Sequence, residues 1–352
     1  MRGRGDRLAG QLAAAELDRM LVTDLVNVRY LTGFTGTNGA CVCGPETRLL
    51  LTDFRYTERA EAEVDGWDVI TVRDDWLGGV AERLTGRTGF EDDHASVRYV
   101  ERLRAKLPDG VELVAAGGTV ERLRRVKDEE ELTAIAAAAE LADEVWRWSL
   151  EQGLAGRSER AVARGAEARI WELGGEPSFP AIVAAGPNSA LPHAEPGERA
   201  IKRGEVVVFD MGAKLDGYCS DGTRTFATGE PGEQAREVYE LVRQAQDAAL
   251  VAIRAGVEGE SLDAIAREPI AAAGHGERFG HGLGHGVGLE VHEAPRLSPR
   301  SEDVLEPGEV VTVEPGVYLP GELGVRIEDL VVVEAEGFRS LSGLGKELRL
   351  VD

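Results

Sequence analysis

Two segments of the chain repeat one another, and each ends in a carboxylate. Residues 204–212 read GEVVVFDMG, and residues 308–316 read GEVVTVEPG. A valine-rich run introduced by glycine is typical of a buried β-strand. Asp210 and Glu314 occupy the same place in the two copies. The repeat therefore predicts two related halves, each with an acidic side chain at the end of a strand.

A second acid follows each copy, and a histidine-rich stretch separates the copies. Asp221 lies eleven residues after Asp210, and Glu328 lies fourteen residues after Glu314. The intervening residues 281–292 read HGLGHGVGLEVH. Acids at strand ends or bulges can be directed into one shared cavity, because strand side chains alternate between faces. Four carboxylates there would repel unless cations neutralise them, so the pattern predicts a site for two divalent ions.

The donor atoms of this predicted site constrain the metal. Carboxylate oxygens with one imidazole favour Mn²⁺, with Co²⁺, Fe²⁺ or Zn²⁺ as alternatives. Two such ions about 3.5–4 Å apart would hold a bridging water or hydroxide as the nucleophile. Of the six histidines, only His94 lies outside the half that carries the acids, and we expect His94 and His275 to be structural or surface residues. The combination of residues, rather than any single acid, is the functional signal.

Length and charge limit the remaining options. The chain has 352 residues, of which 43% are hydrophobic, which is enough for two domains with their own cores. The formal net charge of −23 argues against nucleic acid and against an anionic membrane surface, because both select basic patches. No run approaches the roughly 18 apolar residues of a membrane span. We therefore predict a protein that binds neither nucleic acid nor membrane.

Cysteine usage and the N-terminal sequence bear on the compartment. The three cysteines, Cys41, Cys43 and Cys219, lack the spacing of a disulfide framework, which fits a reducing environment. Cys41 and Cys43 are expected on one face of a buried strand. Charged residues interrupt the stretch after the basic N-terminus, so no signal peptide is predicted. The expected location is the cytoplasm.

Residues 1–122 are predicted to form a smaller α/β domain with a mixed sheet. Short apolar runs alternate with segments of helical periodicity, which is the pattern of such domains. A turn at residues 44–47 joins two of the runs into a hairpin. The expected strands are residues 20–23, 40–43, 49–52, 69–72 and 112–115, and the expected helices are residues 54–64 and 76–84.

Residues 123–352 are predicted to form an α+β domain. Asp128 and Glu131 have the spacing of a capping box, and apolar positions then recur at helical spacing to about residue 150. Strand pairs flanked by helices in a twice-repeated order predict two halves packed face to face, with the site between them. The further expected elements are helices at 158–173, 233–255 and 261–273 and strand pairs at 204–227 and 308–335.

These motifs closely resemble those of the pita-bread metallopeptidases. Residues 220–226 read SDGTRTF, residues 313–316 read VEPG, and residues 325–329 read VRIED. In the first domain, NVRYLTGF at residues 27–34 and LTDFRY at residues 51–56 are similar to the creatinase/prolidase type. The resemblance implies a C-terminal pita-bread catalytic domain with a pseudo-twofold repeat, preceded by a creatinase/prolidase-like N-terminal domain.

The resemblance also implies a ligand set for two metal ions. The family's ligand positions are matched here by Asp210, Asp221, His285, Glu314 and Glu328. Among these, Asp221 and Glu328 match the acids that bridge the two ions. One departure is Gly222, where the family commonly has an apolar residue. We expect a local packing change at Gly222 and no loss of a ligand.

Further positions are implied to contact the substrate or support the ligands. His193 is expected to face the substrate and help bind or protonate at the scissile bond, and His292 to stabilise the oxyanion. Arg296 resembles the arginine that binds a free carboxylate in prolidases, although an ordinary loop arginine fits the sequence equally well. Arg326 is expected to support the ligands or line the pocket, and His281 to lie behind the ligands.

The implied reaction is hydrolysis of the Xaa-Pro bond of a dipeptide or short peptide by a metal-bridging hydroxide. Glu314 is expected to accept a proton from the nucleophile and pass it to the leaving proline nitrogen. The resemblance favours an Xaa-Pro dipeptidase, with aminopeptidase P acting on longer Xaa-Pro peptides as the alternative. Creatinase does not keep this ligand set. A non-catalytic binding protein on the same fold typically loses ligands, and none is missing here.

The resemblance extends to quaternary structure. Relatives with this N-terminal domain are commonly homodimers, in which that domain closes the partner's active site. Residues 33–38 read GFTGTN and are rich in glycine, which permits a flexible loop. We expect a homodimer and take this loop as the candidate for reaching the neighbouring subunit.

Overall fold

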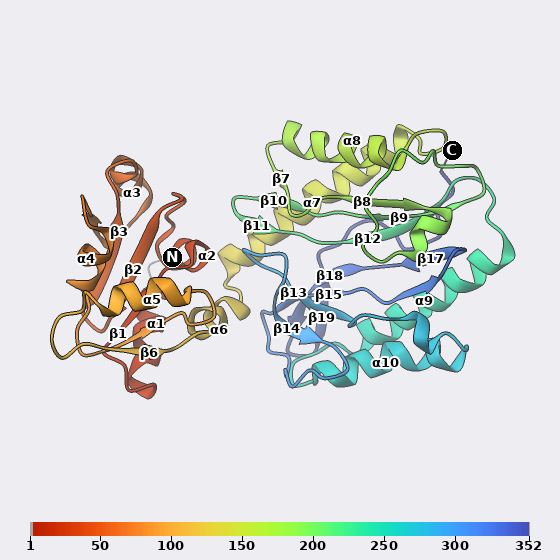
Figure 1. Ribbon diagram of the computed structural model, residues 1–352. Coiled ribbons are helices and arrows are strands. Elements are labelled where there is room, and N and C mark those ends of the chain that lie inside the picture. The colour runs from red at the N-terminus through yellow and green to blue at the C-terminus, as the bar shows by residue number, and fades with distance from the viewer. Residues whose placement is uncertain (1–2, 352) are drawn as a thin grey trace. The chain divides into compact units, whose positions relative to one another are not determined.

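The computed structural model describes residues 3–351 and divides the chain into two compact units, shown in Figure 1. The N-terminal unit extends to Arg124, and the C-terminal unit begins at Arg125. The division falls near the end of helix α6 (Thr119–Arg125), close to the boundary predicted after residue 122. Residues 1, 2 and 352, at the outer ends of the predicted domains, lie outside the described residues.

The N-terminal unit is built on a six-stranded mixed sheet with the strand order β4-β3-β2-β1-β5-β6. Strand β2 runs antiparallel to β1 and β3, whereas the pairs β1–β5, β5–β6 and β3–β4 are parallel. The mixed sheet and the β2–β3 hairpin were predicted, but β5 was missed because its RTGF sequence has no apolar run. The strands are β1 (Arg19–Val22), β2 (Gly39–Gly44), β3 (Thr47–Thr52), β4 (Asp68–Thr71), β5 (Arg87–Phe90) and β6 (Glu112–Ala115).

Helices cover this sheet, and strand alternation decides which side chains meet them. Leu21 and Val42 pack in one cluster with residues of α4 and α5. The alternate residues Cys41 and Cys43 face the other way, and Cys43 Sγ donates a hydrogen bond to a backbone carbonyl of α1. The core position predicted for both cysteines is confirmed. The helices are α1 (Arg4–Ala14), α2 (Leu25–Thr32), α3 (Thr57–Glu63), α4 (Trp76–Ala81) and α5 (Val97–Arg104).

The C-terminal unit opens with the long helix α7 (Glu129–Glu151), which the capping box predicted. The Asp128 carboxylate accepts from the Glu131 amide at 3.0 Å, and the Glu131 carboxylate accepts from the Asp128 amide at 3.1 Å. Helix α8 (Glu159–Glu172) begins after Ser158, whose hydroxyl accepts a hydrogen bond from the Ala161 amide. No helix in the described range 3–351 is both long and apolar enough to cross a membrane.

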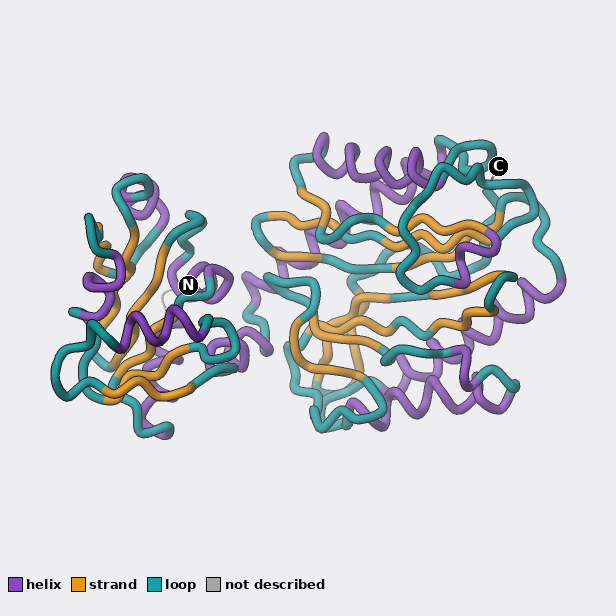
Figure 2. Tube along the Cα trace, in the orientation of Figure 1, coloured by secondary structure: helices purple, strands orange, loops and turns teal. Residues whose placement is uncertain are grey.

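Two related strand groups make up the centre of the C-terminal unit. The first has the order β12-β9-β8, and the second has the order β14-β13-β15-β18-β19. Figures 1 and 2 show these strands lying between α8 on one side and α9 and α10 on the other. The first group comprises β8 (Ile182–Ala185), β9 (Val206–Asp210) and β12 (Thr223–Ala227), and the second β13 (Gly284–Gly286), β14 (Glu293–Leu297), β15 (Val310–Val313), β18 (Asp329–Glu334) and β19 (Gly337–Ser340).

Shorter elements complete the unit. Two small sheets have the orders β11-β10-β7 and β16-β17. The remaining helices, α9 (Glu233–Ala252) and α10 (Gly259–Ala272), pack on β15 and β18 in one apolar cluster. The small strands are β7 (Glu176–Pro177), β10 (Ala213–Leu215), β11 (Tyr218–Cys219), β16 (Gly316–Leu319) and β17 (Leu323–Arg326), and the 3₁₀ turns are η1 (Gly186–Ala190) and η2 (Gly276–Arg278).

The sequence repeat corresponds to a repeated turn that leads into β9 and β15. Glu205 and Glu309 each accept a hydrogen bond from the amide three residues earlier, at 3.0 Å from Lys202 and 2.9 Å from Glu306. Each glutamate also pairs with an arginine. The same local contacts therefore start both central strands and give their C-terminal ends matching positions, which is where the acids lie.

Candidate metal centre

The four predicted acids lie at the same end of two antiparallel strand pairs. Asp210 is the last residue of β9, and Glu314 directly follows β15. Glu328 directly precedes the partner strand β18, and Asp221 lies two residues before the partner strand β12. The Glu328 amide donates to the carbonyl of Thr223 at 3.0 Å, which ties the two pairs together. Each half of the repeat thus supplies two carboxylates to one place.

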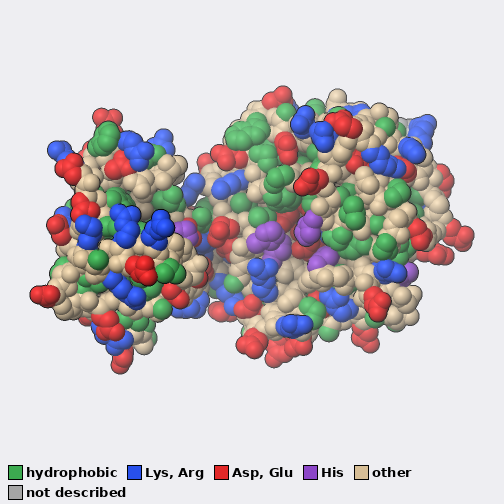
Figure 3. Space-filling model, viewed as in Figure 1, with side chains coloured by type: hydrophobic (Ala, Val, Ile, Leu, Met, Phe, Trp, Pro, Cys, Tyr) green, Lys and Arg blue, Asp and Glu red, His purple; other side chains and the backbone are tan. Residues whose placement is uncertain are grey.

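A cavity of about 620 Å³ opens at this place. Figure 3 shows histidine and acidic side chains gathered on this face of the C-terminal unit. Apolar side chains of the segment around β8, Phe179 and Ile182 among them, form another part of the wall. All the site residues predicted from the sequence line the cavity, namely His193, Asp210, Asp221, His281, His285, His292, Arg296, Glu314, Arg326 and Glu328.

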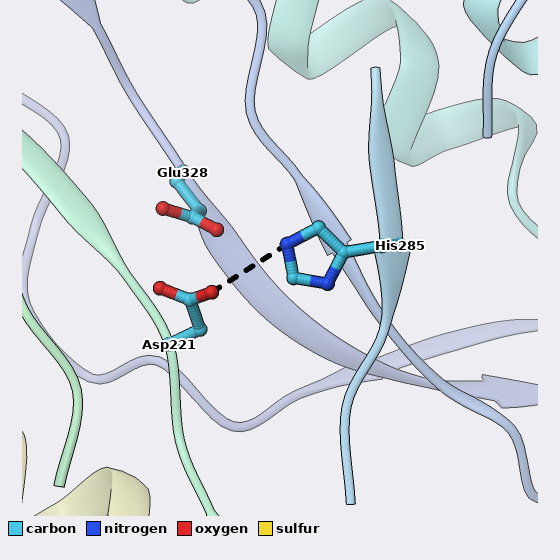
Figure 4. Close-up of side chains that lie close together, drawn as sticks. All are labelled: Asp221, His285 and Glu328. Atoms are coloured by element: carbon cyan, nitrogen blue, oxygen red, sulfur yellow. Dashed lines mark ion pairs between the residues drawn. The ribbon is translucent and has the colours of Figure 1, made fainter. Parts of the chain in front are cut away.

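His285 on β13 turns a ring nitrogen toward the acids. Its Nδ1 lies 3.1 Å from the carbonyl of Gly286, and because a carbonyl can only accept, Nδ1 carries the proton. The other nitrogen, Nε2, then has a lone pair, and it lies 3.5 Å from Asp221 Oδ2 and 3.4 Å from Glu314 Oε1. Ligand atoms of Asp221, His285 and Glu328 all lie within 4.8 Å of one another. Figure 4 shows these three side chains directed toward one another.

Arg326 is the buried cation of the site and is 3% exposed. Its Nη2 donates to Asp210 Oδ2 at 2.5 Å, and its Nε donates to the hydroxyl of Thr223 at 3.0 Å. Thr223 in turn donates to Glu328 Oε2 at 2.8 Å. Arg326 therefore fixes one acid directly and a second acid through Thr223.

Burial shifts the titration of every acid in the centre. It raises the pKa of Asp210, Asp221 and Glu328, and it raises the pKa of Glu314 to about 7. Neighbouring carboxylates are the second cause for Asp221 and Glu328. Burial also lowers the pKa of His285 to about 4, which keeps its imidazole neutral near pH 7. Four acids against one guanidinium leave an excess of negative charge once they ionise.

These residues fit divalent cations. Within residues 3–351, the buried oxygens Asp210 Oδ1 and Glu328 Oε1 have no hydrogen-bond partner, and an unpaired buried acceptor is costly. The His285 lone pair faces two carboxylates, an arrangement that a cation between them stabilises. Oxygen donors with one imidazole are ligands of first-row divalent metals.

Comparison with known proteins decides the family. Residues 133–335 match the model of metallopeptidase family M24, and residues 4–126 match that of the creatinase/prolidase N-terminal domain. The chain belongs to metallopeptidase family M24. The predicted family, the two-domain architecture and the metallopeptidase class are thereby confirmed, and membership of M24 implies divalent metal ions.

Relatives of this M24 peptidase match it over nearly its whole length. An Xaa-Pro dipeptidase from Pyrococcus furiosus is 37% identical over 351 residues, which cover 99% of this chain and 100% of the relative. The solved structure of an Xaa-Pro dipeptidase from Bacillus anthracis is 38% identical with a TM-score of 0.96, over 99% of both chains. That of an X-Pro aminopeptidase from Thermotoga maritima is 35% identical with a TM-score of 0.92, over 99% and 100%.

Three predicted substrate residues lie on the wall of the M24 centre. The ring of His292 packs edge-on against that of His285, with 4.3 Å between the ring centroids. Arg296 on β14 is the register partner of His285 on β13. His193 is exposed on the segment that follows η1. These side chains are available to a bound molecule, whereas the acids lie deeper.

His281 lines the same cavity and makes a contact that the sequence did not indicate. Its Nδ1 donates to the carbonyl of Gly282 at 2.8 Å, so its Nε2 accepts from the Tyr318 hydroxyl at 2.9 Å. Arg326 Nη1 donates to the same hydroxyl at 3.0 Å. Tyr318 and Thr223 were therefore missed as supporting residues, and the available signal was their position on strands that lead to or from the acids.

The indole of Trp146 packs directly against Gly222, the position where a local packing change was expected. A Cβ atom at this position would lie 2.7 Å from Cη2 of Trp146, so the indole occupies the space of the apolar side chain common in the family. Trp146 comes from α7 and is 3% exposed. Asp221, the neighbour of Gly222, remains within the ligand group.

Proposed function

We propose that this M24 metallopeptidase is an Xaa-Pro dipeptidase with two divalent ions, preferentially Mn²⁺. The ions would be held by Asp210, Asp221, His285, Glu314 and Glu328. The observation that carries the proposal is the position of Arg296, which is the register partner of His285 and lines the same cavity as the acids. A guanidinium on the wall of this cavity suits bidentate binding of the free carboxylate of a dipeptide.

When bound, the ions would supply Lewis acidity and a nucleophilic water at neutral pH. The protein's own residues set the conditions for this chemistry. Arg326 and Thr223 hold Asp210 and Glu328 in place, so each acid keeps one buried oxygen without a hydrogen bond inside residues 3–351. Such pre-oriented donors lose little entropy when a cation binds.

Glu314 is the proposed proton carrier. It would take a proton from the nucleophilic water and deliver it to the leaving nitrogen. In the metal-free protein burial raises the pKa of Glu314 to about 7, and a bound cation would lower this pKa. The proline nitrogen leaves as a secondary amine and needs that proton. His292 and His193 on the cavity wall are proposed to stabilise the oxyanion and to contact the substrate near the scissile bond.

An Xaa-Pro aminopeptidase that acts on longer peptides is the alternative. The likeness to the Thermotoga maritima X-Pro aminopeptidase supports it, and so does the exposure of Arg296, which could admit a longer chain.

We also propose a homodimer in which residues 33–38 reach the partner, and a cytoplasmic location. The three cysteines are free and buried, which supports a reducing compartment.

The test is an assay of the purified protein with Mn²⁺ on Leu-Pro and on Leu-Pro-Gly, together with metal analysis. We expect cleavage of the dipeptide alone. Asp221→Asn should lose at least ~100-fold in activity together with bound metal, whereas the exposed control Glu336→Gln should lose neither. Cleavage of the tripeptide at a similar rate would make the protein an aminopeptidase. Metal binding without cleavage of either peptide would favour a binding protein.

A further inference from the structure

Lys127, near the start of the C-terminal unit, forms a buried ion pair with the first residue of β14. Its Nζ lies 3.2 Å from Glu293 Oε2, and the two side chains are 0% and 6% exposed. Two charges are buried together at a cost that their mutual attraction must offset, and removing one leaves the other unpaired. The pair therefore fixes Glu293 firmly against the segment that opens α7.

Glu293 holds the turn that carries His292. Its Oε1 accepts a hydrogen bond from the Glu290 amide at 3.1 Å, which closes residues 290–293. Gly288 lies so close that a Cβ atom there would be 2.6 Å from Glu293 Oε2. His292 directly precedes Glu293, so Lys127 acts on the turn from which this histidine reaches the cavity.

Arg125 makes a corresponding connection to the other end of β14. Its Nη1 donates to Asp303 Oδ1 at 2.7 Å, and Asp303 Oδ2 accepts from the Arg296 amide at 2.8 Å. Its Nε pairs with the buried Glu309, and its Nη2 donates to the carbonyl of Val304 at 2.7 Å. The Asp303 carboxylate thus joins the side chain of Arg125 to the backbone of Arg296.

We propose that Arg125 and Lys127 are positioning residues for substrate binding on β14. Lys127 acts through Glu293 on His292, and Arg125 acts through Asp303 on Arg296. One short segment, placed directly after the N-terminal unit in the chain, thereby holds both ends of the strand that faces the substrate. The inference rests on the proposed function, which gives His292 and Arg296 their roles.

The two connections have separable kinetic consequences. A contact to the oxyanion acts in the transition state, so a misplaced His292 lowers kcat. A contact to the substrate carboxylate acts equally in the bound ground state, so a misplaced Arg296 raises KM. If Arg125 and Lys127 had a purely structural role, their substitution would lower the amount of folded enzyme. It would not lower chiefly kcat in one variant and raise chiefly KM in the other.

The experiment compares Lys127→Met and Arg125→Gln on Leu-Pro with Arg300→Met, an exposed arginine on the loop after β14, as the matched control. We expect kcat to fall about 10- to 100-fold for Lys127→Met at nearly unchanged KM. KM should rise about tenfold for Arg125→Gln, with a smaller fall in kcat than for Lys127→Met, because Glu309 at the start of β15 also loses its partner. Lys127→Arg should recover most of the lost kcat, and the control should match the wild type. Equal changes in kcat and KM for both variants would overturn the proposal.

Amide hydrogen exchange gives a readout that does not need activity. Exchange should accelerate at Glu290 in Lys127→Met and at Arg296 in Arg125→Gln, because those amides bond to the released carboxylates. Unchanged exchange at both amides would refute the positioning role. If the wild type cleaves no Xaa-Pro peptide while exchange changes as expected, the proposed function fails and the positioning of β14 stands. If Lys127→Met does not fold, the double variant Lys127→Met with Glu293→Gln replaces it. If Arg125→Gln does not fold, Asp303→Asn replaces it. Neither substitute leaves a buried charge unpaired.

Discussion

Burial raises the pKa of every carboxylate in the centre, and this has a consequence for stability. Burial raises the pKa of Glu314 from 4.5 to about 7 and that of Asp210, Asp221 and Glu328 in the same direction. Between pH 4.5 and about pH 7 the metal-free folded protein keeps protons on these carboxylates that the unfolded chain has already released. Its stability must therefore fall as pH rises through this interval.

Metal binding displaces these protons, so we expect the stabilisation by Mn²⁺ to grow from pH 5 to 7. The melting temperature of the protein in chelator should fall over this interval, by about 2–4 °C for each kcal/mol lost. Calorimetry at pH 5, 6 and 7 measures the gap between the melting temperatures with and without Mn²⁺. A Glu328→Gln variant should show a flatter dependence. A gap that stays constant with pH would contradict this account.

At the residue scale, the sequence and the family resemblance located the acids, histidines and arginines on the cavity wall, but not the apolar part of the wall or the residues that support the acids. The repeat led to the four acids and the histidine stretch to an imidazole ligand, whereas the family resemblance supplied His193, His292, Arg296 and Arg326. Tyr318 and Thr223 were missed, because their roles arise only when Arg326 reaches across from another strand. Such contacts depend on the packing of strands that are distant in sequence, and no local pattern encodes them.

Among the elements, those with strong local signals were predicted well. The capping box of Asp128 and Glu131 located α7, and valine-rich runs located β9 and β15. The elements that were missed include helices α1, α2, α5 and α6 and strands β5, β8, β13 and β14. Their segments are short or mixed in polarity, and their structure depends on packing against neighbouring elements, which can override local propensity.

The contact between α7 and the start of β12 supplies a test at this scale. Gly222→Val would add methyl groups where a Cβ alone lies 2.7 Å from the Trp146 ring, and the buried indole has little room to move. We expect a loss of about 1–3 kcal/mol in the free energy of unfolding, measured in urea. In a Trp146→Phe background the cost should be smaller, because the ring atom that it meets is gone. An equal cost in both backgrounds would show that the two positions are not coupled.

At the scale of the whole molecule, the two units have separate apolar cores, and only one of them carries the proposed metal site. The N-terminal unit has its own apolar cluster around Leu21 and Val42, and separate clusters fill the C-terminal unit. All the proposed metal ligands belong to the C-terminal unit. A ligand stabilises only the cooperative unit that contains its site, so bound metal should act on one unit alone.

Calorimetry of the full chain is expected to resolve two transitions, of which only the C-terminal one responds to metal. At a free Mn²⁺ concentration of about 1,000 Kd the stabilisation is about 4.1 kcal/mol, which for a unit of this size raises its melting temperature by about 2–4 °C per kcal/mol. Asp221→Asn should remove the response and leave the other transition in place. Hydrogen exchange during heating assigns each transition to its unit. Equal shifts of both transitions on adding metal would mean that the chain unfolds as a single unit, because metal bound in one half would then stabilise both.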